Sequence, residues 1–125
     1  MIETLKCLFA EFEPPVLFAY IFGSTGTELQ HPQSDLDIAV YIDVEASAVE
    51  LDHKLSLYAD ISRATKRNDV DVVILNTCTN HILLYEIMTR GRLIYEANFE
   101  ARVVYEQRAL HSAIDFKEQR ERIFA

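Results

Sequence analysis

The sequence predicts an α/β (α+β) domain that occupies residues 1–125, with a mixed sheet of about four strands and flanking helices. Four short runs rich in Val, Ile, Leu and aromatic residues have the length of strands, and segments with apolar residues every three or four positions alternate with them. A chain of 125 residues, 50% of them hydrophobic, suffices for one core and leaves little room for a second. We expect the helices to cover the sheet mostly on one side.

The first half of the chain shows clear stop signals between its elements. Pro14 and Pro15 end the first helical pattern, and the unbroken apolar run after them is typical of a strand buried on both faces. Pro32 ends a short helical turn, and a second apolar run follows it. The expected elements are a helix over 2–12, a strand over 16–22, a turn over 24–30 and a strand over 36–42.

The second half continues the alternation. A long helical pattern precedes a Val-rich strand, and the next helix is capped by Thr79 or Asn80 and ended by Gly91. A short strand and a long final helix complete the chain. The expected elements are a helix over 46–66, a strand over 70–75, a helix over 80–90, a strand over 92–95 and a helix over 98–124.

Charge and cysteine content narrow the functional classes. The net charge of −8 disfavours a long nucleic acid as a direct partner and favours a basic protein. Cys7 and Cys78 lack the spacing of a metal site, so we expect two buried, reduced thiols. The N-terminus does not resemble a secretion signal and no stretch has the length of a membrane span, so we expect a cytoplasmic protein that does not contact a membrane.

One motif dominates the sequence. Gly23 and Ser24 end the first strand, and Asp35 and Asp37 open the second. Gly23 permits a tight turn, and the helical turn that Ser24 begins would present backbone N–H groups to a phosphate. Side chains alternate along a strand, so Asp35 and Asp37 point the same way. Two carboxylates on one face, beside a phosphate-binding turn, suit Mg²⁺ and a nucleoside triphosphate.

A third carboxylate is expected from a neighbouring strand. Asp71 lies within an apolar run, where a buried charge is costly unless it is paired or binds a metal. The alternative is an Asp at a strand edge, paired with an Arg. Asp69 shares its face but lies at the strand start, where we expect it to be solvated. The candidate catalytic and metal-binding residues are therefore Asp35, Asp37 and Asp71.

These residues resemble the signature of a minimal nucleotidyltransferase (MNT) of the DNA polymerase β-like superfamily. That signature has Gly-Ser, about ten residues, Asp-x-Asp, and a third Asp on a later strand. The resemblance covers nearly the whole chain and implies a polymerase β-like palm fold. It also implies that Gly23, Ser24 and Thr25 bind ATP and that Mg²⁺ is the cofactor. Many relatives have a basic residue after Gly-Ser, whereas this chain has Thr25.

The resemblance further implies an antitoxin of the HEPN/MNT toxin–antitoxin type, which transfers AMP from ATP to a tyrosine of a HEPN ribonuclease toxin. Two alternatives stay open. The chain would neutralise the toxin by binding alone, or it would transfer a nucleotide to a small hydroxylated molecule. The apolar residues of the final helix would serve either the core or a docking surface.

Overall fold

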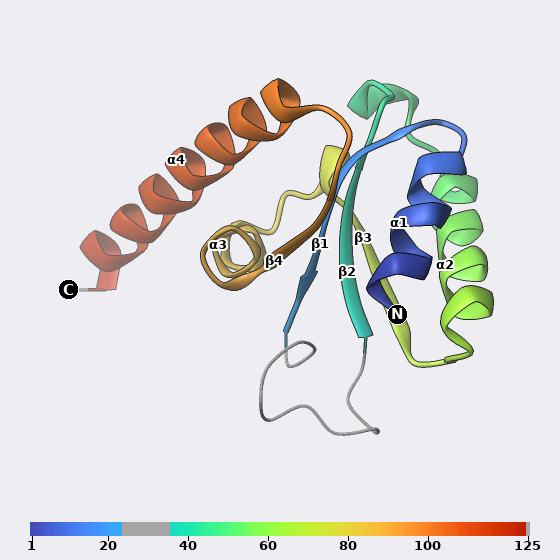
Figure 1. Ribbon diagram of the computed structural model, residues 1–125. Coiled ribbons are helices and arrows are strands. Elements are labelled where there is room, and N and C mark those ends of the chain that lie inside the picture. The colour runs from blue at the N-terminus through green and yellow to red at the C-terminus, as the bar shows by residue number, and fades with distance from the viewer. Residues whose placement is uncertain (24–35, 125) are drawn as a thin grey trace.

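The architecture is a four-stranded sheet with helices packed on it (Figure 1). The computed structural model describes residues 1–23 and 36–124. In chain order its main elements are α1 (Ile2–Glu11), β1 (Val16–Phe22), β2 (Leu36–Ile42), α2 (Leu51–Thr65), β3 (Val70–Ile74), α3 (His81–Arg90), β4 (Arg92–Glu96) and α4 (Phe99–Phe124). The four predicted strands and the four predicted longer helices are confirmed, with ends that differ by a few residues. The predicted turn over 24–30 lies outside the described residues.

The sheet is mixed, as predicted, and its strand order is β3-β2-β1-β4. β1 pairs antiparallel with both β2 and β4, whereas β2 and β3 are parallel. Parallel neighbours need a crossover connection, and α2 provides it. β3 therefore forms one edge of the sheet and β4 the other.

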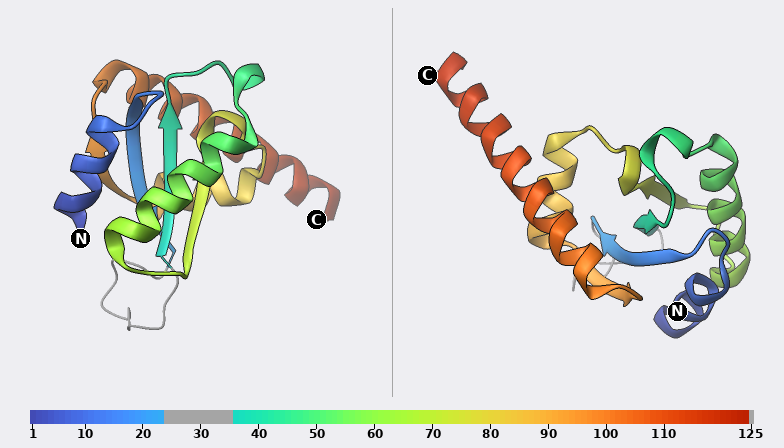
Figure 2. Two further views of the ribbon diagram at one scale, coloured as in Figure 1. Left: turned by 90° about the vertical axis from the view of Figure 1, so that its right-hand side faces the viewer. Right: turned by 90° about the horizontal axis from the view of Figure 1, so that it is seen from above.

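Helices cover both faces of the sheet, so the prediction of a sheet covered mostly on one side is wrong. Viewed from above, α1 and α2 lie on one side of the strands, and α3 and α4 lie on the other (Figure 2). Each side has its own apolar cluster. One includes Phe9, Ile38 and Leu57, and the other includes Phe18 and Ile87. β1 has a continuous apolar sequence because both of its faces are buried.

The helix expected over 46–66 is in fact two elements. A 3-10 turn, Ala46–Ala48, is followed by extended backbone at Val49 (φ −71°, ψ 127°), and α2 begins at Leu51. The backbone N–H of Glu50 donates to Nδ1 of His53 at 3.0 Å, which satisfies a donor that the helix itself leaves free. The His53 side chain thus marks the true helix start.

Two local contacts hold the ends of α3. Asn80 is the N-cap, since its Oδ1 accepts from the backbone N–H of Leu83 at 3.1 Å. At the other end, a Cβ on Gly91 would lie 2.3 Å from the carbonyl oxygen of Ile87. The predicted helix stop at Gly91 is confirmed, and glycine is required there by close approach to the backbone.

The side chain of Asn76 joins the end of β2 to the segment after β3. It accepts from the N–H of Ile42 at 3.0 Å and donates to the carbonyls of Ile42 and Val44, both at 2.8 Å. Three backbone groups at the end of β2 are satisfied by this one amide. The contact keeps the turn after β3 close to the neighbouring strand.

α4 packs mainly against α3, and its later part extends beyond the sheet (Figures 1 and 2). Ala109 and Ala113 are buried, while Phe99, Ile114 and Phe116 are exposed. The helix therefore contributes Ala109, Ala113 and the partly buried Tyr105 to the core and leaves several larger apolar residues at the surface. In the described part of the chain no helix has the length and apolar character needed to cross a membrane.

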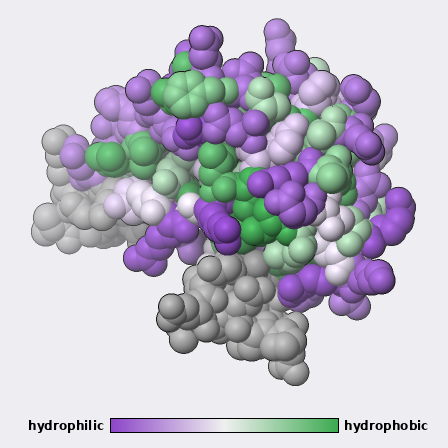
Figure 3. Space-filling view, viewed as in Figure 1, coloured by the Kyte–Doolittle hydropathy of each residue, from purple (hydrophilic) through white to green (hydrophobic). Residues whose placement is uncertain are grey.

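The β4 edge carries apolar surface. Figure 3 shows hydrophobic side chains gathered in the middle of the view, with hydrophilic ones around them. A cavity of about 410 Å³ lies along β4, lined by Leu93, Ile94 and Tyr95 together with Lys6 and Glu96. Cys7 is exposed rather than buried as expected, Cys78 is half-buried, and both thiols are free.

Candidate active site

The turn that leaves β1 brings the backbone against a carboxylate of β2. Gly23 follows the last residue of β1 and has φ +73°, a conformation that favours glycine. The register pairs Phe22 with Asp37, so Gly23 lies next to that aspartate. A Cβ on Gly23 would lie 2.3 Å from Oδ2 of Asp37. The glycine is needed both for its backbone conformation and for the space that the carboxylate occupies.

Asp37 and Asp71 are neighbours on adjacent strands. The parallel register of β2 and β3 pairs them directly. The residues two positions further along, Ala39 and Val73, belong to the apolar cluster on the α3 side, so both carboxylates lie on that face. Adjacent strands lie about 4.8 Å apart, which makes the two negative charges close neighbours. Such a pair favours a bound cation, because the cation offsets their mutual repulsion.

The predicted environment of Asp71 needs correction. Its side chain is exposed, because β3 is an edge strand, whereas the sequence placed it inside a buried strand. Asp37 is half-buried. Asp71 lines a cavity of about 460 Å³ along the edge of β3, which also includes Lys54 at the start of α2 and Thr77 after β3. A substrate can therefore reach this carboxylate from solvent.

Asp69 has a structural role instead of a solvated one. Nε and Nη2 of Arg67 donate to its two carboxylate oxygens at 2.8 and 2.7 Å. The hydrogen bond from Arg67 lowers the pKa of the Asp69 carboxyl. The carbonyl of Asp69 accepts from the N–H of Leu36 at 3.0 Å. Asp69 thus anchors the start of β3 and is not part of the carboxylate pair.

Three of the predicted site residues, Ser24, Thr25 and Asp35, lie outside the described residues, and their roles stay predictions. Among the described residues, no three His, Cys, Asp or Glu side chains come together as a metal site. The two carboxylates that are described nevertheless provide the oxygen donors that Mg²⁺ prefers. The space beside Asp37 also exists only because residue 23 has no Cβ. The described donors therefore fit a hard divalent cation.

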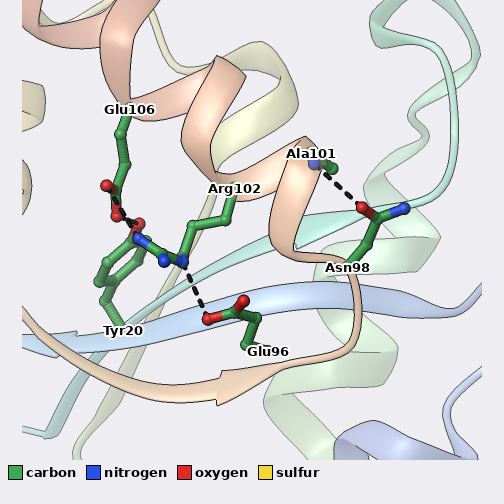
Figure 4. Close-up of polar contacts among 6 residues, drawn as sticks. All are labelled: Tyr20, Glu96, Asn98, Ala101, Arg102 and Glu106. Atoms are coloured by element: carbon green, nitrogen blue, oxygen red, sulfur yellow. Dashed lines mark hydrogen bonds and ion pairs between the residues drawn. The ribbon is translucent and has the colours of Figure 1, made fainter.

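Two features near the site were missed by the sequence analysis. Lys54 reaches the cavity of Asp71 because α2 crosses beside β3, and spacing along the chain gives no sign of that contact. The second feature is a polar network between β1, β4 and α4 (Figure 4). Its signal was present, since Tyr20 is a polar-tipped residue in an otherwise apolar strand.

The network ties α4 to the strand that leads into Gly23. The hydroxyl of Tyr20 donates to Oε1 of Glu106, and Arg102 donates to Glu106 at 3.0 Å and to Glu96 at 2.9 Å (Figure 4). Burial and the hydrogen bond to Glu106 raise the pKa of the Tyr20 hydroxyl, and the carboxylate of Glu106 raises the pKa of the Arg102 guanidinium. The backbone N–H of Ala101 donates to Oδ1 of Asn98 at 3.0 Å, so the Asn98 side chain caps the start of α4.

Comparison with known proteins gives one family and a set of similar folds. The family model described as polymerase beta, nucleotidyltransferase, matches residues 3–100. No curated protein matches the chain.

Solved structures of the same fold come from toxin–antitoxin complexes. A chain of a toxin–antitoxin complex with AMP-PNP is 21% identical, with a TM-score of 0.81 over 98% of this chain and 94% of that one. A chain from the complex of tri-AMPylated Shewanella oneidensis HEPN toxin with MNT antitoxin is 20% identical, with a TM-score of 0.75 over 98% and 92%. A chain of the MntA–HepT complex is 19% identical, with a TM-score of 0.74 over 98% and 92%. At these identities the likeness establishes the fold.

Proposed function

The chain belongs to the polymerase β nucleotidyltransferase family, and we propose that it is an antitoxin that transfers AMP from ATP to a tyrosine of a HEPN ribonuclease toxin. The observation that carries this proposal is the placement of Asp37 beside Asp71, at a turn where Gly23 has no side chain. The matched chains of the toxin–antitoxin complexes with AMP-PNP and with a tri-AMPylated HEPN toxin have the same fold as this chain. They support ATP as the donor and a HEPN toxin as the acceptor.

Each residue of the proposed site has a defined task. Asp37 and Asp71, with Asp35 as the predicted third carboxylate, would hold Mg²⁺. When bound there, Mg²⁺ would offset the negative charge of the triphosphate. Gly23, with Ser24 and Thr25, would bring backbone N–H groups close to the phosphates. The half-buried Asp37 and the exposed Asp71 suit different tasks, because Asp71 is the more open of these two carboxylates to an incoming acceptor.

The proposed reaction is a substitution at the α-phosphorus of ATP. The tyrosine oxygen forms a bond to that phosphorus, the bond to the bridging oxygen breaks, and pyrophosphate leaves. The phenol proton passes to the carboxylate of Asp71. A free tyrosine hydroxyl has a pKa of about 10, so a carboxylate placed beside it is needed near neutral pH.

The test is AMP transfer to a purified partner. We expect the cognate HEPN-type toxin to gain one or more AMP units by intact mass when it is incubated with the chain, ATP and Mg²⁺. Chelation of the metal should abolish the gain. Asp37→Asn and Asp71→Asn should also abolish it while leaving the thermal unfolding curve cooperative. No mass gain with the wild-type chain would refute the proposal, and toxin neutralisation by Asp37→Asn would favour binding alone.

A further inference from the structure

The cavity that Asp71 lines lies on the outer side of the proposed site. β3 is an edge strand, so Asp37 and the turn at Gly23 are inward of Asp71. Among the described residues, none of β1 or β2 lines the cavity. The attacking and leaving oxygens of a phosphoryl transfer lie roughly in line, and the proposed phosphate site is at Gly23. The cavity is therefore on the side of Asp71 from which an acceptor would approach.

The cavity offers side chains and not strand backbone. Val72 and Ile74 are only 1% and 7% exposed, so the backbone of this edge is covered. The polar groups at the wall are the exposed side chains of Lys54, Asp71 and Thr77. Pockets of about 300–1,000 Å³ hold small ligands, so the volume of about 460 Å³ has room for a tyrosine side chain.

Lys54 is the only cation among the described residues that line this cavity. No ion pair within residues 1–23 and 36–124 includes it, although Glu50 and Asp71 line the same cavity. The chain as a whole carries a net charge of −8. An unpaired ammonium group beside the acceptor side of the site favours a carboxylate on the incoming molecule.

An apolar stripe on α2 continues from the cavity. Leu51, Leu55 and Tyr58 are spaced by four and three residues and share one helix face. They are 69%, 53% and 39% exposed, and a row of large exposed apolar side chains is typical of an interaction surface.

Two contacts place this stripe on the β3 side of α2. Leu51 is itself part of the cavity wall, and the hydroxyl of Tyr58 donates to the carbonyl of Asn68 at 3.4 Å, just before β3 begins. α2 also packs on β3 along the same side of the sheet (Figure 2). The stripe and the cavity therefore form one continuous surface, which we call the acceptor surface.

We infer that the acceptor surface docks the part of the toxin that surrounds its acceptor tyrosine. This inference rests on the proposed function. The tyrosine enters the cavity beside Asp71, apolar side chains of the toxin cover the stripe, and a carboxylate of the toxin binds Lys54. Asp71 belongs both to the carboxylate pair and to the cavity wall. This continuity selects the protein that carries the acceptor over an unrelated partner.

The extent of the cavity limits where the toxin carboxylate lies. Along β3 the cavity runs from Asp71 to Ile74, which is about 10 Å of strand. An acidic residue of the toxin should therefore lie within about that distance of the phenol oxygen of the modified tyrosine. Apolar residues should surround this pair, because they meet the exposed side chains of the stripe.

Titration of the purified toxin into the chain without ATP tests the apolar part. Leu51→Gln combined with Leu55→Gln changes the stripe, whereas Leu93→Gln combined with Val104→Gln changes two side chains, 37% and 45% exposed, on β4 and α4. We expect the Kd for the toxin to rise at least about tenfold for the stripe variant and less than about threefold for the control. Circular dichroism should show both variants folded. A stripe variant that binds the toxin no more weakly than the control overturns the inference.

Reversal of one charge tests the role of Lys54. Lys54→Glu and Lys6→Glu change the net charge equally, but Lys6 lies on α1, beside the β4 edge. We expect Lys54→Glu to raise the Kd for the toxin about tenfold or more and to leave the KM for ATP within about twofold of wild type, while Lys6→Glu changes neither. Equal effects of the two variants would assign the loss to net charge and overturn the inference for Lys54. A raised KM for ATP with an unchanged Kd for the toxin would also overturn it.

These measurements are separate from the test of the proposed function. The Kd for the toxin is measured without ATP, so it stays measurable if AMP transfer is absent. Absent transfer with a weakened stripe variant rejects the proposed reaction and leaves the docking surface in place. AMP transfer by the wild-type chain with no effect of the stripe variant rejects this inference alone.

Discussion

Replacing Gly23 with alanine probes the close contact between the β1 turn and Asp37. The added Cβ would lie 2.3 Å from Oδ2 of Asp37, closer than real Cβ atoms approach. The backbone at φ +73° also becomes unfavourable for a residue with a side chain. Either the turn or the carboxylate must move, and both belong to the proposed site.

The expected effects have different sizes. The left-handed backbone conformation costs about 1–2 kcal/mol for alanine, which lowers the midpoint of thermal unfolding by roughly 3–10 °C in a domain of this size. Moving a reacting group by about 1 Å costs about a hundredfold in rate. Activity should therefore fall far more than stability.

The assay measures AMP transfer to the partner at saturating ATP, together with thermal unfolding followed by circular dichroism. Gly91→Ala is the matched control. Its added Cβ would also lie 2.3 Å from an oxygen, but that oxygen is the backbone carbonyl of Ile87 and not a carboxylate of the proposed site. We expect Gly91→Ala to lower stability while the rate for the folded protein stays within about twofold of wild type.

The reasoning fails if Gly23→Ala transfers AMP at the wild-type rate. It also fails if the rate and the folded fraction fall in parallel, as they should for Gly91→Ala. Either result would mean that Asp37 accommodates the methyl group without loss of function.

Two further predictions concern stability. Burial raises the pKa of the Tyr20 and Tyr105 hydroxyls, and the hydrogen bond to Glu106 raises that of Tyr20 further. The contribution of these hydroxyls to stability is therefore fully present below the unfolded pKa of about 10 and declines as pH rises beyond it. The free energy of unfolding measured in urea between pH 8 and 11 should show this decline. Tyr20→Phe should cost about 1–2 kcal/mol at pH 8 and make the decline with pH shallower. A decline as steep as that of the wild-type chain would contradict the assigned role of the Tyr20 hydroxyl. Asn76→Ala leaves three backbone groups of Ile42 and Val44 without their partner and should cost about 2–3 kcal/mol in urea unfolding; a loss below about 0.5 kcal/mol would show that water replaces the amide.

Most elements of the fold were predictable from local sequence. Continuous apolar runs marked β1 and β2, and Asn80 and Gly91 marked the ends of α3. The start of α2 was missed because Ala46 and Ala48 favour a helix, while the contact between Glu50 and His53 is an unusual cap. Coverage of both faces was missed although the apolar run of β1 already indicated it.

The site was predictable in part. The adjacency of Asp37 and Asp71 follows from two strands joined by one crossover helix, which favours parallel neighbours. The exposure of Asp71 depends on β3 being at the edge, and strand order is a long-range property that local patterns do not contain. The same holds for Lys54, whose place in the cavity depends on how α2 crosses β3.

The order of the strands separates the chemistry from the rest of the molecule. The turn after β1, the carboxylate of β2 and the carboxylate of β3 are contiguous, whereas β4 lies on the far side of β1. A fluorophore or an immobilisation handle attached through the exposed side chain of Leu93 on β4 would therefore be two strands away from Asp37. The β4 edge is therefore suited to attaching the protein to a surface while the binding of a partner near Asp37 and Asp71 is measured.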